Sequence, residues 1–259
     1  MLQNQLKEKL LAGKAVVGTI PQTDSPLHLN VLAESDFDFI LIDTQHSQID
    51  VSMLGRMITI LKPHKDIIVR AIFNHTHLVN QVLDAGADGV IIPLTDTAEE
   101  VEKAVQAAKY PPRGIRSWGP KGAWYYGGPV EYAHIANDEV IVLPQVESQT
   151  AVDNLDEILS IDGVDGIMIG PADLGLTLGV LPHEGKEVRD AAIQTVLDKC
   201  IEHGKPWGMF TSTLETATQW LTRGGQIATV GTEVGFTQDG ICLLYTSPSP
   251  RARGCSRMP

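Results

Sequence analysis

The chain has 259 residues, of which 43% are hydrophobic and 20% are charged, and its formal net charge is −12 at pH 7. This length and composition suit one large α/β domain with a sizeable core, whereas the acidic balance argues against a nucleic-acid-binding surface. No stretch reaches the roughly 20 apolar residues of a membrane span, and three Cys are too few for a disulfide framework. Residues 1–14 predict an amphipathic helix rather than a signal peptide, so we expect a soluble cytoplasmic protein.

Short apolar runs alternate with helical patterns along the chain. Near-continuous apolar runs are typical of strands that are covered on both faces. The eight predicted strands span residues 15–20, 37–44, 66–72, 88–94, 139–147, 165–171, 206–212 and 226–233. Stretches with a helical period, such as 97–110 and 151–160, lie between them. Eight strands alternating with helices predict a (β/α)8 barrel. A doubly wound open sheet is the alternative, which the absence of a GxGxxG motif after the first strand disfavours.

Two segments depart from this alternation. Residues 111–138 form a long connection with four aromatic residues, Trp118, Trp124, Tyr125 and Tyr126, among Gly and Pro. Long loops in compact domains are often functional, and aromatic residues argue against disorder. Residues 241–259 hold two Ser-Pro steps and three Arg, with no acidic residue and no helical period. We therefore expect one barrel domain over 1–240, followed by an atypical tail that is not native barrel sequence and leaves strand eight uncovered.

Polar residues stand at the carboxyl ends of several predicted strands. In a barrel these ends meet at one rim, where catalytic sites are built. The candidates are Asp43, Gln45 and His46 after strand two, Arg70 on strand three, Gln145 and Glu147 on strand five, and Asp173 in the "GPADL" segment after strand six. Their convergence is a prediction of the fold, because they are far apart in the sequence.

Each candidate also has a structural interpretation. Glu147 and Asp173 could cap helices, but as a pair at adjacent strand ends they suit a hard cation such as Mg²⁺ or Mn²⁺. Arg70 is costly inside a barrel unless it is paired. It either neutralises Glu147 or binds an anion or a developing oxyanion. His46, three residues after Asp43, either forms a proton-transfer pair with it or caps the next helix; the local spacing favours the cap.

Two further features concern anion binding. The backbone N–H groups of "GPADL" stand at the start of a helix or turn and suit a carboxylate or phosphate. Arg116, in the long connection, is either a substrate contact or a residue that staples the loop.

Six stretches together resemble the HpcH/HpaI aldolase family of metal-dependent class II pyruvate aldolases. They are "FDFILIDTQH", "VRAIFN", "LDAGADGVIIPL", "YPPRGIRSWGP", "VLPQVES" and "VDGIMIGPADL". They occur in family order at family spacing, and the resemblance runs from about residue 13 to about residue 235. It implies a (β/α)8 barrel, commonly a hexamer with a swapped last helix. It also implies reversible cleavage of a 2-keto-4-hydroxy acid into pyruvate and an aldehyde, with Mg²⁺ or Mn²⁺ and with Co²⁺ as a further candidate.

The resemblance also implies a role for each candidate residue. Glu147 and Asp173 would be metal ligands, Gln145 would lie close to the pyruvate, Arg70 would face its keto oxygen, and His46 with Asp43 would be the acid/base pair. The N–H groups around Gly170, Pro171 (which has none itself) and Ala172 would hold the pyruvate carboxylate. Asp84 matches a position that reaches a neighbouring subunit's aldehyde pocket. Gln45 is a departure, because the family often has an acidic residue there.

Two other functions fit the same residues. One is an acyl-CoA lyase of the citrate-lyase β type, which the lack of a basic patch for the CoA phosphates disfavours. The other is a pyruvate- or oxalate-binding barrel without turnover. In every case the expected partner is a small molecule, a 2-keto acid and an aldehyde for the aldolase, with no nucleic acid and no membrane.

Overall fold

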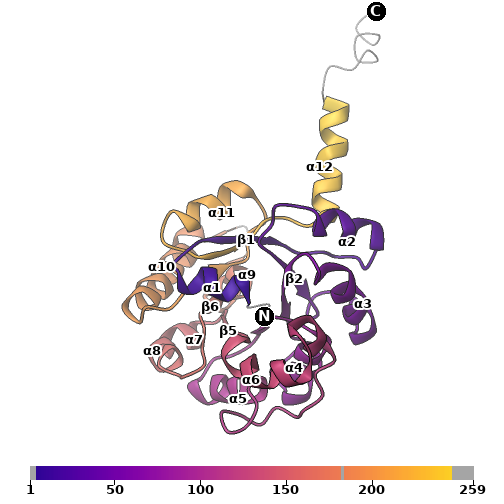
Figure 1. Cartoon of the computed structure of the whole chain (residues 1–259). Coiled ribbons are helices and arrows are strands. Elements are labelled where there is room, and N and C mark those ends of the chain that lie inside the picture. Colours follow the sequence, from indigo (N-terminus) through magenta and orange to yellow (C-terminus); the bar gives the residue numbers. More distant parts are fainter. Residues whose placement is uncertain (1–3, 182–183, 247–259) are drawn as a thin grey trace, which may run out of the picture.

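The computed structural model describes residues 4–181 and 184–246, and its centre is a closed barrel of eight parallel strands (Figure 1). The strands are β1 (Val16–Thr19), β2 (Phe39–Asp43), β3 (Asp66–Arg70), β4 (Gly89–Ile92), β5 (Ile141–Val146), β6 (Ile167–Ile169), β7 (Trp207–Met209) and β8 (Ile227–Thr229). Each strand pairs with the next in the chain, and β8 pairs with β1 through Val16 and Ile227. This closure confirms the predicted (β/α)8 barrel and excludes the open sheet.

Helices surround the barrel (Figure 1). They are α1 (Gln5–Leu11), α2 (Pro26–Ala33), α3 (Val51–Leu61), α4 (Thr76–Ala85), α5 (Ala98–Ala108), the 3₁₀ helix η1 (Lys121–Tyr126), α6 (Pro129–Glu139), α7 (Gln149–Asp153), α8 (Leu155–Leu159), α9 (Pro171–Thr177), α10 (Lys186–Glu202), α11 (Leu214–Leu221) and α12 (Glu233–Thr246). Local signals set their ends: Thr97 and Glu100 form a capping box on α5, and α4 stops at Gly86, which has a φ of 114°. None of the helices in the described part of the chain is both long enough and apolar enough for a bilayer crossing.

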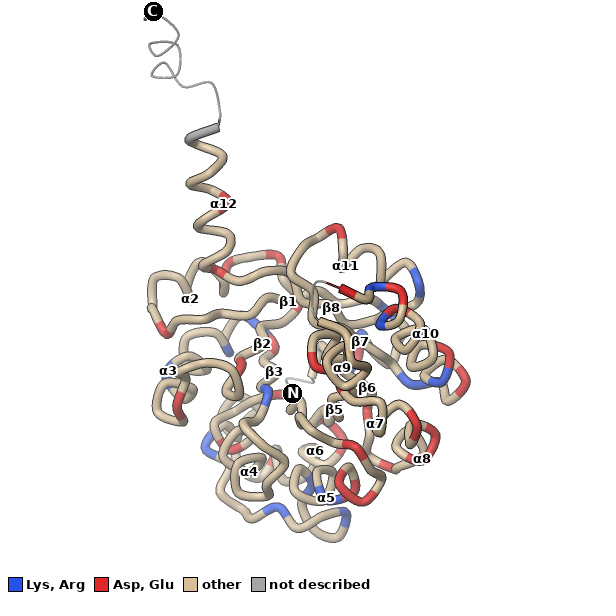
Figure 2. Tube along the Cα trace, turned by 180° about the vertical axis from the view of Figure 1, so that it is seen from behind, with Lys and Arg blue, Asp and Glu red and all other residues tan. Residues whose placement is uncertain are grey.

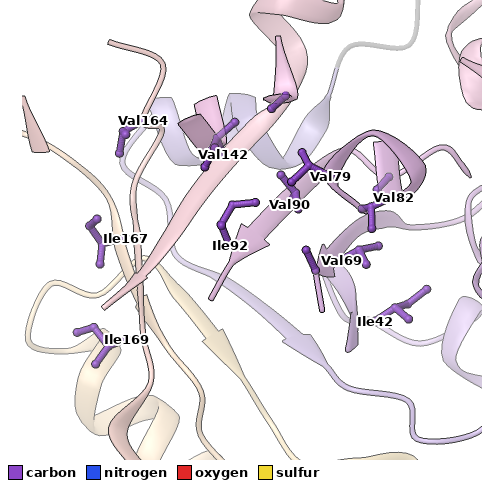
Figure 3. Close-up of a cluster of buried hydrophobic side chains, with 14 of the residues drawn as sticks. Ile42, Val69, Val79, Val82, Val90, Ile92, Val142, Val164, Ile167 and Ile169 are labelled. Carbon is purple, nitrogen blue, oxygen red and sulfur yellow. The ribbon is translucent and has the colours of Figure 1, made fainter. Parts of the chain in front are cut away.

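The core has two layers because side chains alternate along each strand. Phe39 and Leu41 belong to the cluster inside the barrel, whereas Ile40 and Ile42 pack between the strands and the helices. Figure 3 shows the outer layer, in which strand residues such as Val69 lie near helix α4. Both faces of each strand are therefore apolar, which explains the continuous hydrophobic runs in the sequence.

Carboxylates and α1 close the amino-terminal end of the barrel. Asp38, Asp88 and Asp165 each accept a hydrogen bond from a backbone N–H near the start of the preceding strand, those of Val17 (2.8 Å), Ile67 (2.6 Å) and Val142 (2.9 Å). Each also pairs with a lysine, Lys9, Lys62 and Lys7 respectively. Asp66 accepts from the N–H of Leu6 in α1 at 2.8 Å. Three of these carboxylates satisfy donors at strand starts, and Asp66 satisfies one in the first turn of α1.

The long connection packs against this same end. The Tyr126 hydroxyl donates to Asp88, and the ring of Tyr126 lies 5.1 Å from that of Tyr132. Residues 111–138 are therefore ordered, with η1 and α6 inside them, as the aromatic content predicted. Lys, Arg, Asp and Glu are interspersed over the helices around the barrel (Figure 2).

The last helix departs from the expectation. Residues 241–246 were expected to lack helical structure, but α12 continues through them and crosses the proposed boundary at residue 240. Its first turn is anchored, because Glu233 accepts from the N–H groups of Gln22 and Thr23. Beyond that turn α12 runs away from the barrel (Figure 1), and Leu243 is 65% exposed. The three residues of β8 are nevertheless all buried. Residues 247–259 lie outside the described residues.

Candidate active site at the carboxyl end of the barrel

Four polar side chains continue the inward-facing pattern of their strands. Asp43 follows Phe39 and Leu41 in alternation, Arg70 follows Ile68, and Gln145 and Glu147 follow Ile141 and Leu143. All four stand at or just beyond a carboxyl strand end and are at most 9% exposed. Residues from β2, β3 and β5 therefore meet at one rim, as predicted.

Arg70 forms a two-pronged ion pair with Asp43. Arg70 Nε lies 2.9 Å from Asp43 Oδ1 and Nη2 lies 2.5 Å from Oδ2. Burial raises the pKa of Asp43, but the hydrogen bonds and charge of Arg70 outweigh it, so the pKa is lowered overall. Arg70 thus forms its ion pair with Asp43 and not with Glu147, whose pKa it lowers only through its charge. This corrects one of the alternatives above. Its Nη1 is 3.5 Å from Gln145 Oε1, and its guanidinium stacks on the Phe210 ring at 4.8 Å.

His46 does not contact Asp43 through its imidazole. Asp43 Oδ1 accepts from the backbone N–H groups of Gln45 (2.9 Å) and His46 (3.4 Å), and Arg70 occupies both carboxylate oxygens. The expected imidazole–carboxylate pair is therefore absent from this structure, where the His46 side chain is exposed. The capping alternative is also wrong, since Asp50 caps α3. Within the described residues, Gln45 Oε1 is buried without a hydrogen-bond partner.

Glu147 lies in a tight polar cradle. Its Oε1 accepts from the N–H of Leu94 at 2.8 Å, and its Oε2 accepts from Gln145 Nε2. Burial raises the pKa of Glu147; these two donors oppose the shift, and the charge of Asp173 adds to it. A Cβ added to Gly170 would lie 3.0 Å from Glu147 Oε2, so only glycine leaves this space open.

The "GPADL" segment forms the start of α9. Gly170 is the N-cap, but its own N–H donates to Val146 O at 3.0 Å, which continues the strand ladder. Pro171 has no N–H, so of the three residues proposed to hold a carboxylate only Ala172 offers an N–H in the first turn. Asp173 follows in the same turn, with its side chain exposed. Fewer backbone N–H groups are therefore free to bind a carboxylate than the sequence indicated.

The donor set at the rim suits a hard divalent cation. The charge of the Asp173 carboxylate raises the pKa of Glu147, and the Gln145 amide lies beside Glu147. The described residues contain no group of three or more His, Cys, Asp or Glu side chains that could hold a metal ion. A cation here would have two carboxylate ligands from the protein and would keep positions for water and substrate.

Asp84 and Arg116 lie elsewhere. Asp84 is in the last turn of α4, and helices of this fold end at the opposite side of the barrel from the rim. Arg116 Nη2 pairs with Asp84 Oδ1 at 2.7 Å, and Nη1 donates to the Tyr132 hydroxyl at 3.0 Å. The Arg116 side chain is completely buried, which fits a residue that staples the loop rather than a substrate contact within this chain.

Two residues at the rim were not among the sequence candidates. Phe210 follows β7 and stacks on Arg70; its place directly after an apolar strand was an available but weak signal. Leu94 follows β4 and donates its N–H to Glu147. Its backbone φ of 54° has no counterpart in the sequence, because Leu gives no indication of a left-handed conformation.

The fold and the rim define a (β/α)8-barrel protein whose carboxyl end combines a paired arginine with a carboxylate pair suited to a cation. The family model described as HpcH/HpaI aldolase/citrate lyase matches residues 21–239. The chain therefore belongs to the HpcH/HpaI aldolase/citrate lyase family, and it is a carbon–carbon lyase of the aldolase type.

Three known proteins illustrate the similarity. The 2-keto-3-deoxy-L-rhamnonate aldolase of Escherichia coli K12 is 33% identical over 244 residues, which cover 93% of this chain and 91% of the relative. A solved HpcH/HpaI aldolase/citrate lyase family protein from Burkholderia cenocepacia J2315 is 26% identical, with a TM-score of 0.87 and coverage of 93% and 98%. A solved citrate synthase, SbnG, is 29% identical, with a TM-score of 0.84 and coverage of 96% and 98%.

Proposed function

We propose that this protein is a metal-dependent aldolase that reversibly cleaves a 2-keto-4-hydroxy acid into pyruvate and an aldehyde. The observation that carries the proposal is the convergence of Arg70, Gln145 and Glu147 at one rim of a family barrel, with Asp173 close enough to raise the pKa of Glu147. The substrate is a 2-keto-3-deoxy sugar acid or a 4-hydroxy-2-oxo-dicarboxylate. The name of the Escherichia coli relative supports the sugar acid.

Glu147 and Asp173 would hold the cation, Mg²⁺ or Mn²⁺ with Co²⁺ as a further candidate. When bound, it would polarise the keto acid and make its methyl protons more acidic. Arg70 places its guanidinium N–H groups where negative charge develops on the keto oxygen, and Asp43 fixes the orientation of that guanidinium. Gln145 and the N–H of Ala172 orient the pyruvate half.

His46 is the proposed base. In cleavage, its imidazole takes the proton of the 4-hydroxyl, the C3–C4 bond breaks, and the aldehyde leaves. The electron pair of that bond passes to the pyruvate enolate, which a proton then converts to pyruvate. Because Asp43 is occupied by Arg70, His46 would act without a carboxylate partner, so Asp43 supports the arginine instead of the histidine.

Pyruvate release tests this function. With 2-keto-3-deoxy-L-rhamnonate as substrate and lactate dehydrogenase as the coupling enzyme, we expect turnover that EDTA abolishes and Mg²⁺ or Mn²⁺ restores. Borohydride added with substrate should not attach pyruvate to the protein, because no lysine Schiff base is required. Activity that resists EDTA, or covalent trapping, would overturn the metal mechanism.

Chemistry on CoA thioesters is the second candidate, favoured by the similarity to the citrate synthase SbnG. Oxaloacetate, acetyl-CoA and water would then yield citrate and free CoA, both identifiable by mass spectrometry. Mass detection is preferable to a thiol reagent because Cys242 is exposed. A binding barrel without turnover would give neither CoA nor metal-dependent pyruvate.

Homo-oligomerisation is part of the proposal. Ile241, Leu243 and Leu244 on α12 are between 51% and 76% exposed, an apolar surface that a second copy could cover. Asp84 would then contribute to the aldehyde pocket of a neighbouring copy. Light scattering should give a mass above one chain for the full protein, and a lower mass after truncation following residue 232. A monomeric full-length protein would refute this part.

A further inference from the structure

Leu94 has a backbone conformation that leucine rarely adopts. Among the described residues it is the non-glycine residue with a positive φ, at 54°. A side chain with a Cβ is disfavoured in this region, which glycine enters freely. Strain of this kind persists when the surroundings enforce it, and it is concentrated at functional sites.

The surroundings of Leu94 do enforce it. Its N–H donates to Glu147 Oε1 at 2.8 Å, and the next residue, Thr95, donates its hydroxyl to the Gln145 carbonyl at 3.3 Å. Asp96 then accepts from the Ser148 hydroxyl at 2.5 Å. Three successive residues after β4 are thus fastened to the end of β5, and Thr95 is completely buried.

The Leu94 side chain is half exposed although its neighbours Pro93 and Thr95 are buried. Its backbone nitrogen is one hydrogen bond from the proposed metal ligand Glu147. The adjacent strand β3 ends in Arg70 and is followed by two other exposed apolar side chains, Ile72 and Phe73. The rim beside the reacting groups is therefore apolar on the β3–β4 side.

We propose that Leu94 determines aldehyde specificity: its side chain, held beside Glu147 by the left-handed backbone, forms an apolar wall for the carbon chain of the aldehyde. This inference rests on the proposed aldolase function. It predicts that the preferred aldehyde carries an alkyl group, rather than a charged group, beyond its carbonyl carbon. Glycine would hold the same backbone and the same N–H with less strain, so replacing Leu94 by Gly isolates the contribution of its side chain.

The test is Leu94→Gly, which removes the side chain and keeps the N–H that Glu147 needs. The aldol direction is measured with pyruvate, Mn²⁺ and either butyraldehyde or glyoxylate. We expect the wild type to favour butyraldehyde. The variant should lose roughly tenfold or more in kcat/KM for butyraldehyde and keep its value for glyoxylate, because lost methylene contacts in an apolar pocket weaken transition-state binding by about this factor. Leu94→Met, which replaces leucine by another apolar side chain, should keep the preference for butyraldehyde that Leu94→Gly loses.

Two controls separate this effect from a damaged site. Mn²⁺ affinity by electron paramagnetic resonance should be unchanged in Leu94→Gly, and Leu94→Gly should unfold at no lower temperature than Leu94→Ala, which keeps the strain. Leu11→Gly removes a leucine that is 79% exposed at the other end of the barrel and should leave the preference intact.

Exchange of the pyruvate methyl protons in D₂O needs no aldehyde and reports the proposed function alone. An unchanged aldehyde preference with intact exchange overturns the role of Leu94 and spares the aldolase. Loss of exchange or of Mn²⁺ binding in Leu94→Gly would assign Leu94 to supporting Glu147 instead of recognising the aldehyde. Absence of exchange in the wild type overturns the function, and this inference with it.

Discussion

The two ends of the barrel both bring carboxylates next to basic side chains, yet they use them differently. At the amino-terminal end, Asp88 accepts from the Ile67 N–H, Lys62 and Tyr126, so the fold occupies its oxygens with internal donors. At the carboxyl end, Glu147 accepts from Leu94 and Gln145 but has no basic ion-pair partner within the described chain, although it is 2% exposed. A buried carboxylate without a direct basic partner is costly. The charge of Arg70 lowers the pKa of Glu147 but does not offset its burial, and a cation would relieve the remaining cost.

Arg70 has a different position from the lysines of the amino-terminal end. It neutralises Asp43 and still directs Nη1 towards Gln145. The charges at the amino-terminal end therefore stabilise the fold, whereas Arg70 also keeps a donor directed into the proposed active site. Removing one group at each end by substitution tests this distinction.

The largest effect is expected for Arg70→Ala. Loss of a donor to a developing oxyanion typically lowers kcat by 10²- to 10³-fold, about 3 to 4 kcal/mol, so pyruvate release should fall by roughly that factor. Arg70→Lys keeps the charge but not the two-pronged contact with Asp43, and should recover only part of the rate. Turnover close to wild type in folded Arg70→Ala would place Arg70 with the structural charges.

Asp88→Ala is the matched change at the amino-terminal end. It leaves Lys62 buried without its counter-charge and leaves the Ile67 N–H without an acceptor, so the free energy of unfolding should fall by about 3 kcal/mol. Urea denaturation measures this loss. The kcat of the folded fraction should stay within about twofold of wild type, because transition-state binding at the rim is untouched. A large fall in kcat would mean that the two ends are coupled.

How far the sequence predicts these ends depends on the kind of information needed. The strand count follows from apolar runs that alternate with helical stretches, and the convergence of Arg70, Gln145 and Glu147 follows from strand ends that meet at one rim of a barrel. The choice of Arg70 over His46 as the partner of Asp43 does not. It depends on the β2–β3 register, in which Asp43 and Arg70 are directly opposite.

The same reason applies to the groups whose predicted roles changed. The Gly170 N–H is consumed because the β5–β6 ladder extends one residue past β6. The φ of Leu94 is imposed by contacts with β5 and has no local signal. The helical path of residues 241–246 is the continuation of a helix that begins at Glu233, although the composition of the tail pointed away from helix.

The third prediction concerns pH at the amino-terminal end. Burial and then the charge of Asp88 raise the pKa of Asp66 from 3.8 to about 6. Because the folded protein binds the proton more tightly than the unfolded chain, this carboxyl stabilises the fold below its unfolded pKa, and the contribution is lost as pH rises through about 6. From pH 4 to pH 7 the loss is about 2 kcal/mol.

Asp66→Asn tests this directly, since the amide oxygen can still accept from the Leu6 N–H. Thermal unfolding at several pH values should show the variant gaining stability on the wild type between pH 4 and pH 7. If the stability of the two proteins changed with pH in the same way, the pKa of Asp66 would not be raised in the folded protein.

The smallest effect is expected for Arg56→Ala, on the outer surface of α3. Arg56 Nη2 lies 3.0 Å from Asp24 Oδ2, a distance similar to that of Arg70 Nε from Asp43, but its side chain is 57% exposed. Water screens such a pair, so the free energy of unfolding should change by at most about 0.5 kcal/mol, and kcat should not change. Denaturation in low and in high salt measures how much this ion pair contributes to the free energy of unfolding. A loss comparable to that of Asp88→Ala would mean that pairing distance, rather than burial, decides which charges the fold depends on.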